Sequence, residues 1–433
     1  MTPQSNFMVL APVAADRIAD LRQLLATMNS QPGIADPQNP LVPFGQLTRL
    51  HFARMAVLED LSLDDITVYK LPPVNYPTYL TFLGDFDGPF DAFLADMVQR
   101  AGEGLKRIFS YCQDFTSNAD LLAWMKAHNV SPATIYVNWT GRTTQQVREE
   151  EALRQAMEKF IQENQASLRV MPSRETYNRL AKFVQGEQQA GRITLAPPEP
   201  TPLGWKVRNF LHLVGVPLVL LVLLPLLVLY LPFFLFQLRR RETSDPEIAP
   251  RIDPSHARQL ADLEDHYIAN QFTAMGSVKP GLFRRWILTF FLWVVNYTTR
   301  HIYNRGRLAR VTTIHFARWV FLDGRKRLLF ASNYDGSLES YMDDFINKVA
   351  FGLNLVFSNG IGYPTTNWLI LDGAKDEQKF KYYIRRHELA TEVWYDAFPG
   401  LGNMDLKRNT LIREGLDRPY MTDTELQQWL QLF

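Results

Sequence analysis

The sequence predicts an α+β protein in which one domain occurs twice, with a hydrophobic membrane segment inserted between the two copies. Two observations support this class. His-Phe-Ala-Arg occurs at residues 51–54 and again at 315–318, each time inside an apolar run typical of a strand. Between these runs, residues 210–238 contain no Asp, Glu, Lys or Arg. Four identical residues can arise by chance, so the prediction depends on whether the flanking sequence repeats as well.

The flanking sequence repeats in blocks that keep their order. The copies are offset by 264 residues at the tetrapeptide, by 248 between 79–98 and 327–346, and by 259 where His128 aligns with His387. Loop insertions produce such changes of offset. Five residues of the second block have an identical partner in the other copy: Leu80, Phe82, Asp87, Gly88 and Asp96 match Leu328, Phe330, Asp335, Gly336 and Asp344. Matches of type and order over this length indicate a duplicated domain.

Each copy has the predicted element order β-α-β-β-α-β, which is the ferredoxin-like plait. In the first copy we expect strands at 6–13, 47–59, 78–86 and 133–140, helices at 14–29 and 89–112, and a short helix ending near His128. In the second copy we expect strands at 266–278, 311–323, 327–334 and 390–398, an extra strand at 367–373, and helices at 281–303, from Ser337, and ending at His387. The last strand of each copy is expected to close the sheet of that copy.

A plait covers one face of its sheet with helices and leaves the other face in need of a cover. In a tandem protein the sister copy can provide it. We therefore expect two ferredoxin-like (βαββαβ) repeats packed sheet-to-sheet, or as a closed barrel, within one chain. In topology, residues 7–160 and 263–420 resemble the dimeric α+β barrel superfamily, which includes dye-decolorizing peroxidases, chlorite dismutases and small monooxygenases.

Residues 210–238 are long enough for a bilayer, where a span needs about 20 apolar residues. Basic residues flank both ends, Lys206 and Arg208 before and 239–241 after, which favours the cytoplasmic side for both. Three prolines favour a break in the segment: Pro217, Pro225 and Pro232. We therefore expect a re-entrant helical hairpin that keeps both copies in one compartment. The alternative is a single kinked span, with the copies pairing between chains or not at all.

The expected layout has five parts: a first repeat at 1–165, a helical and Pro-rich linker at 166–209, the membrane segment at 210–238, a polar linker at 239–262 and a second repeat at 263–433. The first residues lack a signal-peptide pattern, and the single cysteine, Cys112, fits a reducing compartment. The soluble parts are therefore expected in the cytoplasm, held at the inner or plasma membrane. A net charge of +1 gives no field that would attract nucleic acid.

The repeated tetrapeptide supplies the first candidate site residues. The imidazoles of His51 and His315 can ligate a haem iron, and Arg54 and Arg318 can stabilise a bound peroxide or a carboxylate between the sheets. Strict alternation along a strand would place each His on the opposite face from its Arg. The alternative is structural: each His bonds a backbone carbonyl, and each Arg pairs with a carboxylate of the sister copy.

Residues 84–88, Gly-Asp-Phe-Asp-Gly, match the GxxDG pattern of dye-decolorizing peroxidases. That resemblance implies a catalytic role for Asp87, which would assist peroxide cleavage. The second copy reads Ser-Asn-Tyr-Asp-Gly, and an Asp N-cap followed by a turn glycine explains both copies. Residues 385–387, Arg-Arg-His, are expected to form a solvated helix end. No metal site is predicted, because the sequence has no CxxC pair and no HExxH motif.

The predicted function is a binding or scaffold role at the membrane surface. Its expected partners are the lipid bilayer and a lipophilic small molecule or membrane protein, with no nucleic acid. The alternative is a haem-dependent, peroxidase-like oxidoreductase with its site between the two repeats, which the resemblance implies at the level of fold only.

Overall fold

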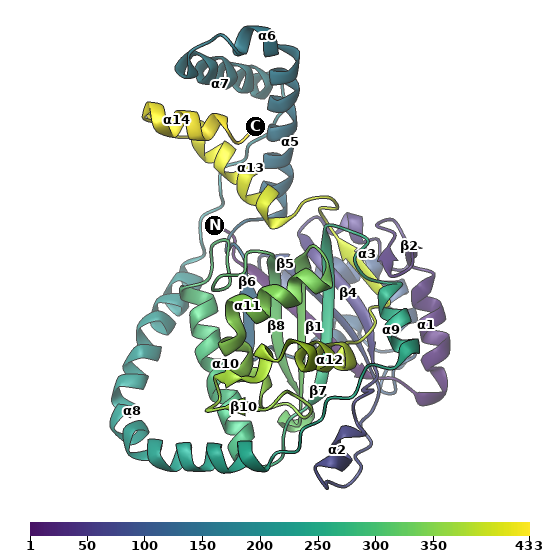
Figure 1. The fold of residues 1–433 in the computed structure, drawn as a ribbon. Helices are drawn as coiled ribbons and strands as arrows, with labels where there is room; N and C mark the ends of the chain where they lie inside the picture. The colour runs from purple at the N-terminus through teal and green to yellow at the C-terminus, as the bar shows by residue number, and fades with distance from the viewer.

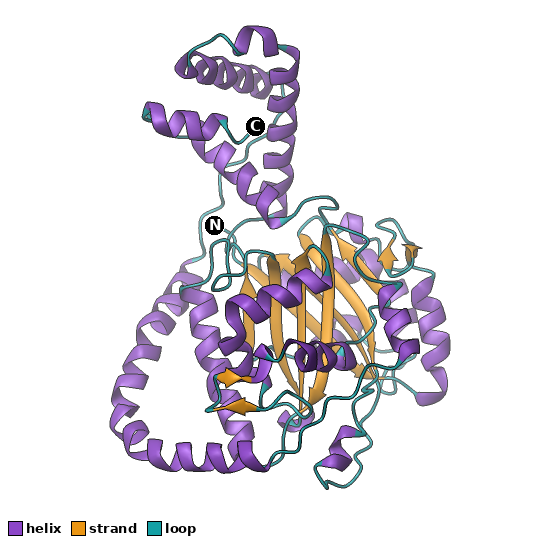
Figure 2. Cartoon of the chain, in the orientation of Figure 1, coloured by secondary structure: helices purple, strands orange, loops and turns teal.

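The structure is a computed structural model that describes residues 1–433. It is an α+β protein with two main β-sheets, so the predicted class is confirmed. Figure 2 shows the strands at the centre of the molecule, a group of helices projecting from one end and a long bowed helix at the side.

The first sheet has six strands and is mixed. All neighbouring strands are antiparallel except β12 and β3, which are parallel. Every residue of β4 is buried, as expected for a strand whose sheet is covered on both faces. The strand order is β1 (Gln4–Pro12), β5 (Tyr79–Asp87), β4 (Leu50–Leu58), β12 (Val393–Asp396), β3 (Ile34–Ala35) and β2 (Asn29–Gln31). The helices that share its core are α1 (Ile18–Ala26), α3 (Phe90–Phe109) and α4 (Leu121–Ala127).

The second sheet has four strands and is antiparallel throughout. Its order is β6 (Thr134–Val137), β8 (Ile314–Leu322), β9 (Arg327–Asp335) and β7 (Ala269–Ser277). The helices that share its core are α10 (Leu282–His301), α11 (Leu338–Phe357) and α12 (Glu377–His387). In place of the extra strand expected at 367–373 there is a short hairpin, in which each strand has two residues. Its strands are β10 (Thr366–Asn367) and β11 (Leu371–Asp372).

The last strand of each half lies in the sheet of the other half. β6 pairs with β8, and β12 pairs with β4, so the expectation that each last strand closes its own sheet is wrong. The residues just before these strands still bond to the first strand of their own half. Val130 N donates to Met8 O, and Leu389 N donates to Thr273 O. Each closing segment therefore starts beside its own sheet and crosses to the other.

The two sheets face each other across a shared apolar layer. One cluster contains side chains from β1, β4 and β5 of the first half together with side chains from β7, β8 and β9 of the second. Its largest members include Met8, Leu58, Met275, Leu322 and Leu329. The exchanged strands and this layer join residues from both ends of the chain into one body.

Helices from both halves also form a small bundle beyond the end of the sheets (Figure 1). Its helices are α5 (Thr144–Glu163), α7 (Ser173–Gln189), α13 (Asn403–Leu416) and α14 (Asp423–Leu430), with the short α6 (Gln165–Leu168) between α5 and α7. Their shared core contains Leu153, Leu180, Ile412 and Trp429. α5 follows β6 directly and α13 follows β12, so the bundle is built on the exchanged strands.

The apolar segment lies within one continuous helix, α8 (Leu203–Ser244), rather than in two arms joined by a turn. Its 42 residues include all three prolines, and Figure 1 shows the helix bowed away from the body. The remaining short helices are α2 (Asp65–Val68) and α9 (Pro254–Ala261).

Both ends of α8 contact the same helix of the body, α10. At its first end, Asn209 Oδ1 accepts from Arg300 Nε at 2.7 Å, and His212 Nδ1 lies 2.8 Å from His301 Nε2. At its other end, Leu238 packs in an apolar cluster with Ile287. The alternative in which the two halves pair between chains therefore differs from the structure, where they pair within one chain.

Candidate functional site: a cavity lined by both halves

The residues of the repeated tetrapeptide are positioned by a β-bulge in each half. The register of β4 against β5 shifts between Leu50 and Phe52, and that of β8 against β9 shifts between Ile314 and Phe316. An extra residue at a bulge changes which face the following side chains occupy. His51 and His315 are these extra residues, so the strict alternation expected along the strands fails there.

As a result, each His lies on the same side of its sheet as the Phe that follows it. His51, Phe52, His315 and Phe316 all line one small cavity between the halves. The ring of His51 lies 5.4 Å from that of Phe316, and the ring of Phe52 lies 5.2 Å from that of His315. The expectation that each His lies on the opposite face of its sheet from its Arg is therefore wrong. Both imidazoles lie in the space between the sheets.

Each His donates to an aspartate at the end of the neighbouring strand. His51 Nε2 lies 2.8 Å from Asp87 Oδ1, and the other oxygen of Asp87 accepts from Thr144 N at 2.7 Å. Thr144 is the first residue of α5, so Asp87 fastens a bundle helix to the sheet. It does not cap α3, because the N-cap of α3 is Pro89 and has no side-chain bond. The N-cap interpretation of Asp87 is therefore wrong.

The second half repeats this arrangement. His315 Nε2 lies 2.5 Å from Asp335 Oδ1, and Asp335 Oδ2 accepts from Asn403 N, in the first turn of α13, at 2.7 Å. The glycine after each Asp has a positive φ, 90° at Gly88 and 85° at Gly336, so the turn-glycine interpretation is confirmed.

Arg54 lies fully buried between the sheets and reaches into the other half. Its Nη1 donates to Phe272 O at 2.7 Å and to Thr273 Oγ1 at 2.8 Å. Its Nη2 donates to Ser332 O at 2.7 Å and to Asn333 Oδ1. Burial, and then the nearby Arg318, lower the pKa of Arg54 to about 9. Both of its terminal nitrogens are engaged by protein groups, so neither is directed at a ligand.

Arg318 makes the reciprocal contacts. Its Nη1 donates to Phe7 O at 2.8 Å, and its Nη2 donates to Gly84 O at 3.2 Å and to Asp85 Oδ1 at 2.5 Å. Burial raises the pKa of Asp85, while Arg318 and Arg54 oppose that rise. Arg318 thus pairs with a carboxylate of the other half, as the structural alternative expects. The rest of that alternative is wrong, because Arg54 bonds the Asn333 amide and each His bonds an aspartate rather than a backbone carbonyl.

The cavity that both halves line has a volume of about 30 Å³. Polar side chains around it besides the two imidazoles are Gln4, Asn138, Arg142 and Asn403. Sequence reasoning singled out neither Arg142 nor Asn403, because neither belongs to a motif.

These residues do not fit a haem. Sites for ligands of drug or cofactor size have volumes of about 300–1,000 Å³, roughly tenfold larger than this cavity. The Nε2 atoms of His51 and His315 are already engaged by carboxylates. No step through haem is therefore derived for this site.

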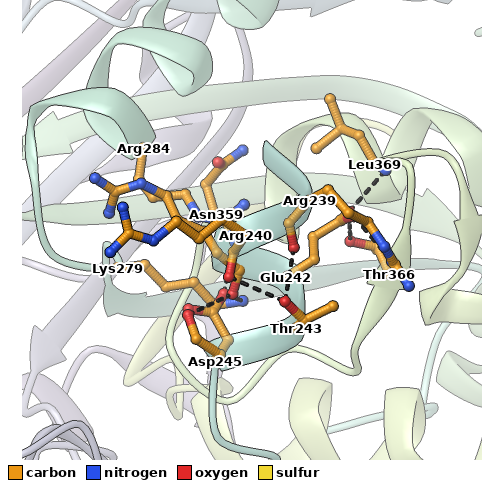
Figure 3. A network of polar contacts seen from close by, with 12 residues as sticks. Arg239, Arg240, Glu242, Thr243, Asp245, Lys279, Arg284, Asn359, Thr366 and Leu369 are labelled. Atoms are coloured by element: carbon orange, nitrogen blue, oxygen red, sulfur yellow. Dashed lines mark hydrogen bonds and ion pairs between the residues drawn. The ribbon is translucent and has the colours of Figure 1, made fainter. Parts of the chain in front are cut away.

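A second candidate region is the polar network where α8 rejoins the body (Figure 3). Glu242, which is buried, accepts from Thr366 Oγ1 and Leu369 N, both at 2.8 Å, and from Trp368 N at 3.0 Å. Because one carboxylate receives three donors from the 366–369 segment, the end of α8 is fixed to the β10–β11 hairpin.

Asp245 completes this attachment from just beyond the last turn of α8. Its Oδ2 lies 2.9 Å from Lys279 Nζ and 2.6 Å from Arg284 Nη2, and Lys279 and Arg284 are both buried. Burial, and then Arg284, lower the pKa of Lys279 to about 8, while Asp245 opposes that shift. The contacts tie α8 to the first turn of α10.

The basic end of α12 is packed against the body rather than solvated, with His387 buried and both arginines half-buried, so that expectation is wrong. His387 is 3 % exposed, and its Nδ1 lies 2.8 Å from Tyr383 O. Arg386 pairs with the buried Asp65 at 2.5 Å. These groups attach α12 to the segment around α2.

Comparison of the chain with models of protein families, with curated proteins and with solved structures finds no match.

Proposed function

We propose that α8 anchors this protein to one face of a membrane, where the body serves as a binding or scaffold module. The observation that carries the proposal is the exposed middle of α8. Its apolar window has a mean hydropathy of 2.9, and none of it is buried. Leu229, for example, is 79 % exposed. Water-soluble monomers rarely expose apolar patches larger than a few hundred Å², whereas a bilayer stabilises them.

The attachment of both ends to α10 favours an in-plane or shallow anchor over a crossing. We call residues 214–233 of α8, which lie between its contacts with α10, the arch. Leu213 and Phe234 flank the arch and contact Tyr297 and Phe283 of α10. A straight helix from Leu213 to Phe234 would be about 31 Å long, whereas their contacts on α10 are about 21 Å apart. The helix must bow outward, and prolines allow that bend. A crossing would place its two ends on opposite sides.

Aromatic and apolar side chains on the body extend the proposed membrane face. On α10, Leu282, Trp286 and Phe290 are exposed at a spacing of four residues, next to the face that receives α8. Trp368 is exposed on the β10–β11 hairpin, and the guanidinium of Arg239 lies 5.7 Å from its ring. Exposed tryptophans and arginines at such a border are typical of a membrane interface.

The proposed architecture of the body is two ferredoxin-like repeats that have exchanged their last strands, within the topology of the dimeric α+β barrel superfamily. Its support is the common element order of the halves and the reciprocal contacts of Arg54 and Arg318. Held at a bilayer on the cytoplasmic side, such a body can present a surface to a lipophilic small molecule or a membrane-protein partner. The haem-dependent alternative is not proposed, because the cavity does not fit the group.

The test is vesicle flotation of a linker variant, in which a Gly/Ser chain of equal length replaces residues 214–233. A flexible chain of 20 residues has an end-to-end distance of about 25 Å, enough for the roughly 21 Å between the attachment points. We expect the full chain to float with phosphatidylcholine–phosphatidylglycerol vesicles and the linker variant to stay in the soluble fraction with an unchanged circular dichroism spectrum.

A second variant keeps the helix and replaces two of its exposed apolar side chains by acids, as V222D/L229D. It removes apolar contact with the bilayer and adds repulsion from the anionic lipid, so this variant should also lose vesicle binding. Flotation of the linker variant to the same extent as the full chain would contradict the proposed anchor.

A further inference from the structure

Most of the apolar residues that line the cavity between the halves have an apolar counterpart in the other half, whereas several of the polar ones do not. His51 and Phe52 correspond to His315 and Phe316 at the offset of 264 residues. At the offset of 259, two further pairs face each other across the cavity: Trp139 with Phe398, and Val147 with Leu406. Arg142 has no such counterpart, since the second half has Leu401 at the corresponding position. The first half therefore has a cation at a position where the second half has an apolar residue.

Arg142 is a buried cation that no protein carboxylate pairs with. It is 5 % exposed, and its guanidinium lies over the ring of Trp139 at 4.1 Å. Its Nε and Nη2 atoms have no hydrogen-bond partner, so no carboxylate accepts from them. Burial lowers its pKa to about 10, with Glu150 and Glu414 opposing the shift, so it stays charged at neutral pH. A buried charge without a partner is costly unless a ligand or water completes it.

The carboxylates that pair with the two imidazoles are already used, and Glu150, which acts on the pKa of Arg142, accepts from Gln146 Nε2 and Thr410 Oγ1. Each oxygen of Asp87 and of Asp335 has a donor, one from an imidazole and one from a backbone N–H. Neither carboxylate is thus available to Arg142 without breaking those bonds. Asn403 adds a second set of free polar atoms, because it is 5 % exposed and neither its Oδ1 nor its Nδ2 has a partner.

We propose that this cavity binds one small monovalent anion, with Arg142 as its counter-charge and the Asn403 amide as a second donor. A volume of about 30 Å³ holds about two waters, which is the size of a halide or of formate. Trp139 and three phenylalanines, Phe52, Phe316 and Phe398, line the cavity with apolar surface, which strengthens a contact between opposite charges. The site does not depend on the membrane anchor, since none of its residues belongs to α8.

The test measures the thermal unfolding temperature of the full chain in detergent while chloride replaces gluconate at constant ionic strength. Gluconate is the reference anion because it is too bulky for the cavity. A ligand that binds only the folded state raises the unfolding temperature with its concentration. We expect the Tm to rise by a few degrees for a chain of this size. Arg142→Leu, which installs the residue of the other half, should abolish the rise. Arg100→Leu is the matched control on an exposed residue of α3 and should retain it.

A second readout covers the case in which Arg142→Leu does not fold. Bromide quenches tryptophan fluorescence on contact, and Trp139 stacks on Arg142. Titration of the wild-type chain should show a saturable component that Trp139→Phe removes, above the linear quenching of the exposed tryptophans. Equal Tm values in chloride and gluconate, together with purely linear quenching, would mean that only water fills the cavity and would overturn the proposal.

Discussion

Replacing Arg318 by Met is expected to lower the free energy of unfolding by about 3–5 kcal/mol, the range measured when one partner of a buried ion pair is removed. Arg318 is 2 % exposed and bonds Asp85 across the two halves. Its loss leaves that carboxylate buried without its ion-pair partner and removes a donor from the carbonyls of Phe7 and Gly84. Urea unfolding of the linker variant, followed by circular dichroism, measures the change.

The control for this effect is an exposed ion pair. Arg100 lies 2.7 Å from Asp96 on α3, with about two-fifths of each side chain exposed, and Arg100→Met should cost no more than about 0.5 kcal/mol. The double variant R318M/D85N should recover part of the loss, because it removes the uncompensated charge. An Arg318→Met variant as stable as Arg100→Met would show that the two halves do not meet as described.

Cutting the chain between its halves is expected to leave a folded two-fragment complex. A protease site placed within the Gly/Ser linker of the linker variant allows the cut. Each fragment would carry one strand that completes the other fragment's sheet, β6 in one and β12 in the other. The apolar layer between the sheets and the core of the helical bundle also contain side chains from both fragments. We therefore expect the cut protein to elute from a sizing column at the position of the uncut protein.

The same sample in denaturant should separate into two fragments, which confirms that the cut is complete. Separation in native buffer would contradict the exchange of strands, since halves that each closed their own sheet would be held by surface contacts alone.

Much of the fold could be predicted from the sequence because it depends on local pattern and on the repeat. The strands around 51–54 and 315–318 and the helices after Asp87 and Asp335 lie where the alignment places them. The partners of β6 and β12 could not be predicted. Strand periodicity fixes which face is buried, whereas the choice between a neighbour in the same half and one in the other half depends on long-range packing.

The shape of α8 was beyond sequence reasoning for a related reason. Three prolines favour a bend or a break equally, and a proline inside a helix removes only one backbone bond each time. The structure keeps the helix continuous, and side chains outside the apolar segment attach both of its ends to the body. Glu242 and Asp245 provide this attachment at one end, and Asn209 provides it at the other.

The candidate site could be predicted in part. His51 and His315 were recognised as a pair, but the bulges that turn them toward the cavity leave no signature in the tetrapeptide. Arg142 did leave a signal, because the alignment that defines the repeat sets it against Leu401. A charged residue aligned with an apolar one, at a position where neighbouring residues match, is the kind of difference that sequence alone can identify.

The most direct test of the central claim is the accessibility of cysteines placed at the two ends of α8. Lys206→Cys and Ser244→Cys are both on exposed positions, and Leu224→Cys marks the middle of the arch. Burial raises the pKa of the native Cys112 thiol to about 12, so it should not react. Sealed membrane vesicles containing each variant are treated with an impermeant maleimide, before and after permeabilisation.

We expect positions 206 and 244 to show the same labelling pattern, and position 224 to stay unlabelled both before and after permeabilisation. Labelling of one end only before permeabilisation, and of the other only after it, would place the two halves on opposite sides of the membrane and contradict the account.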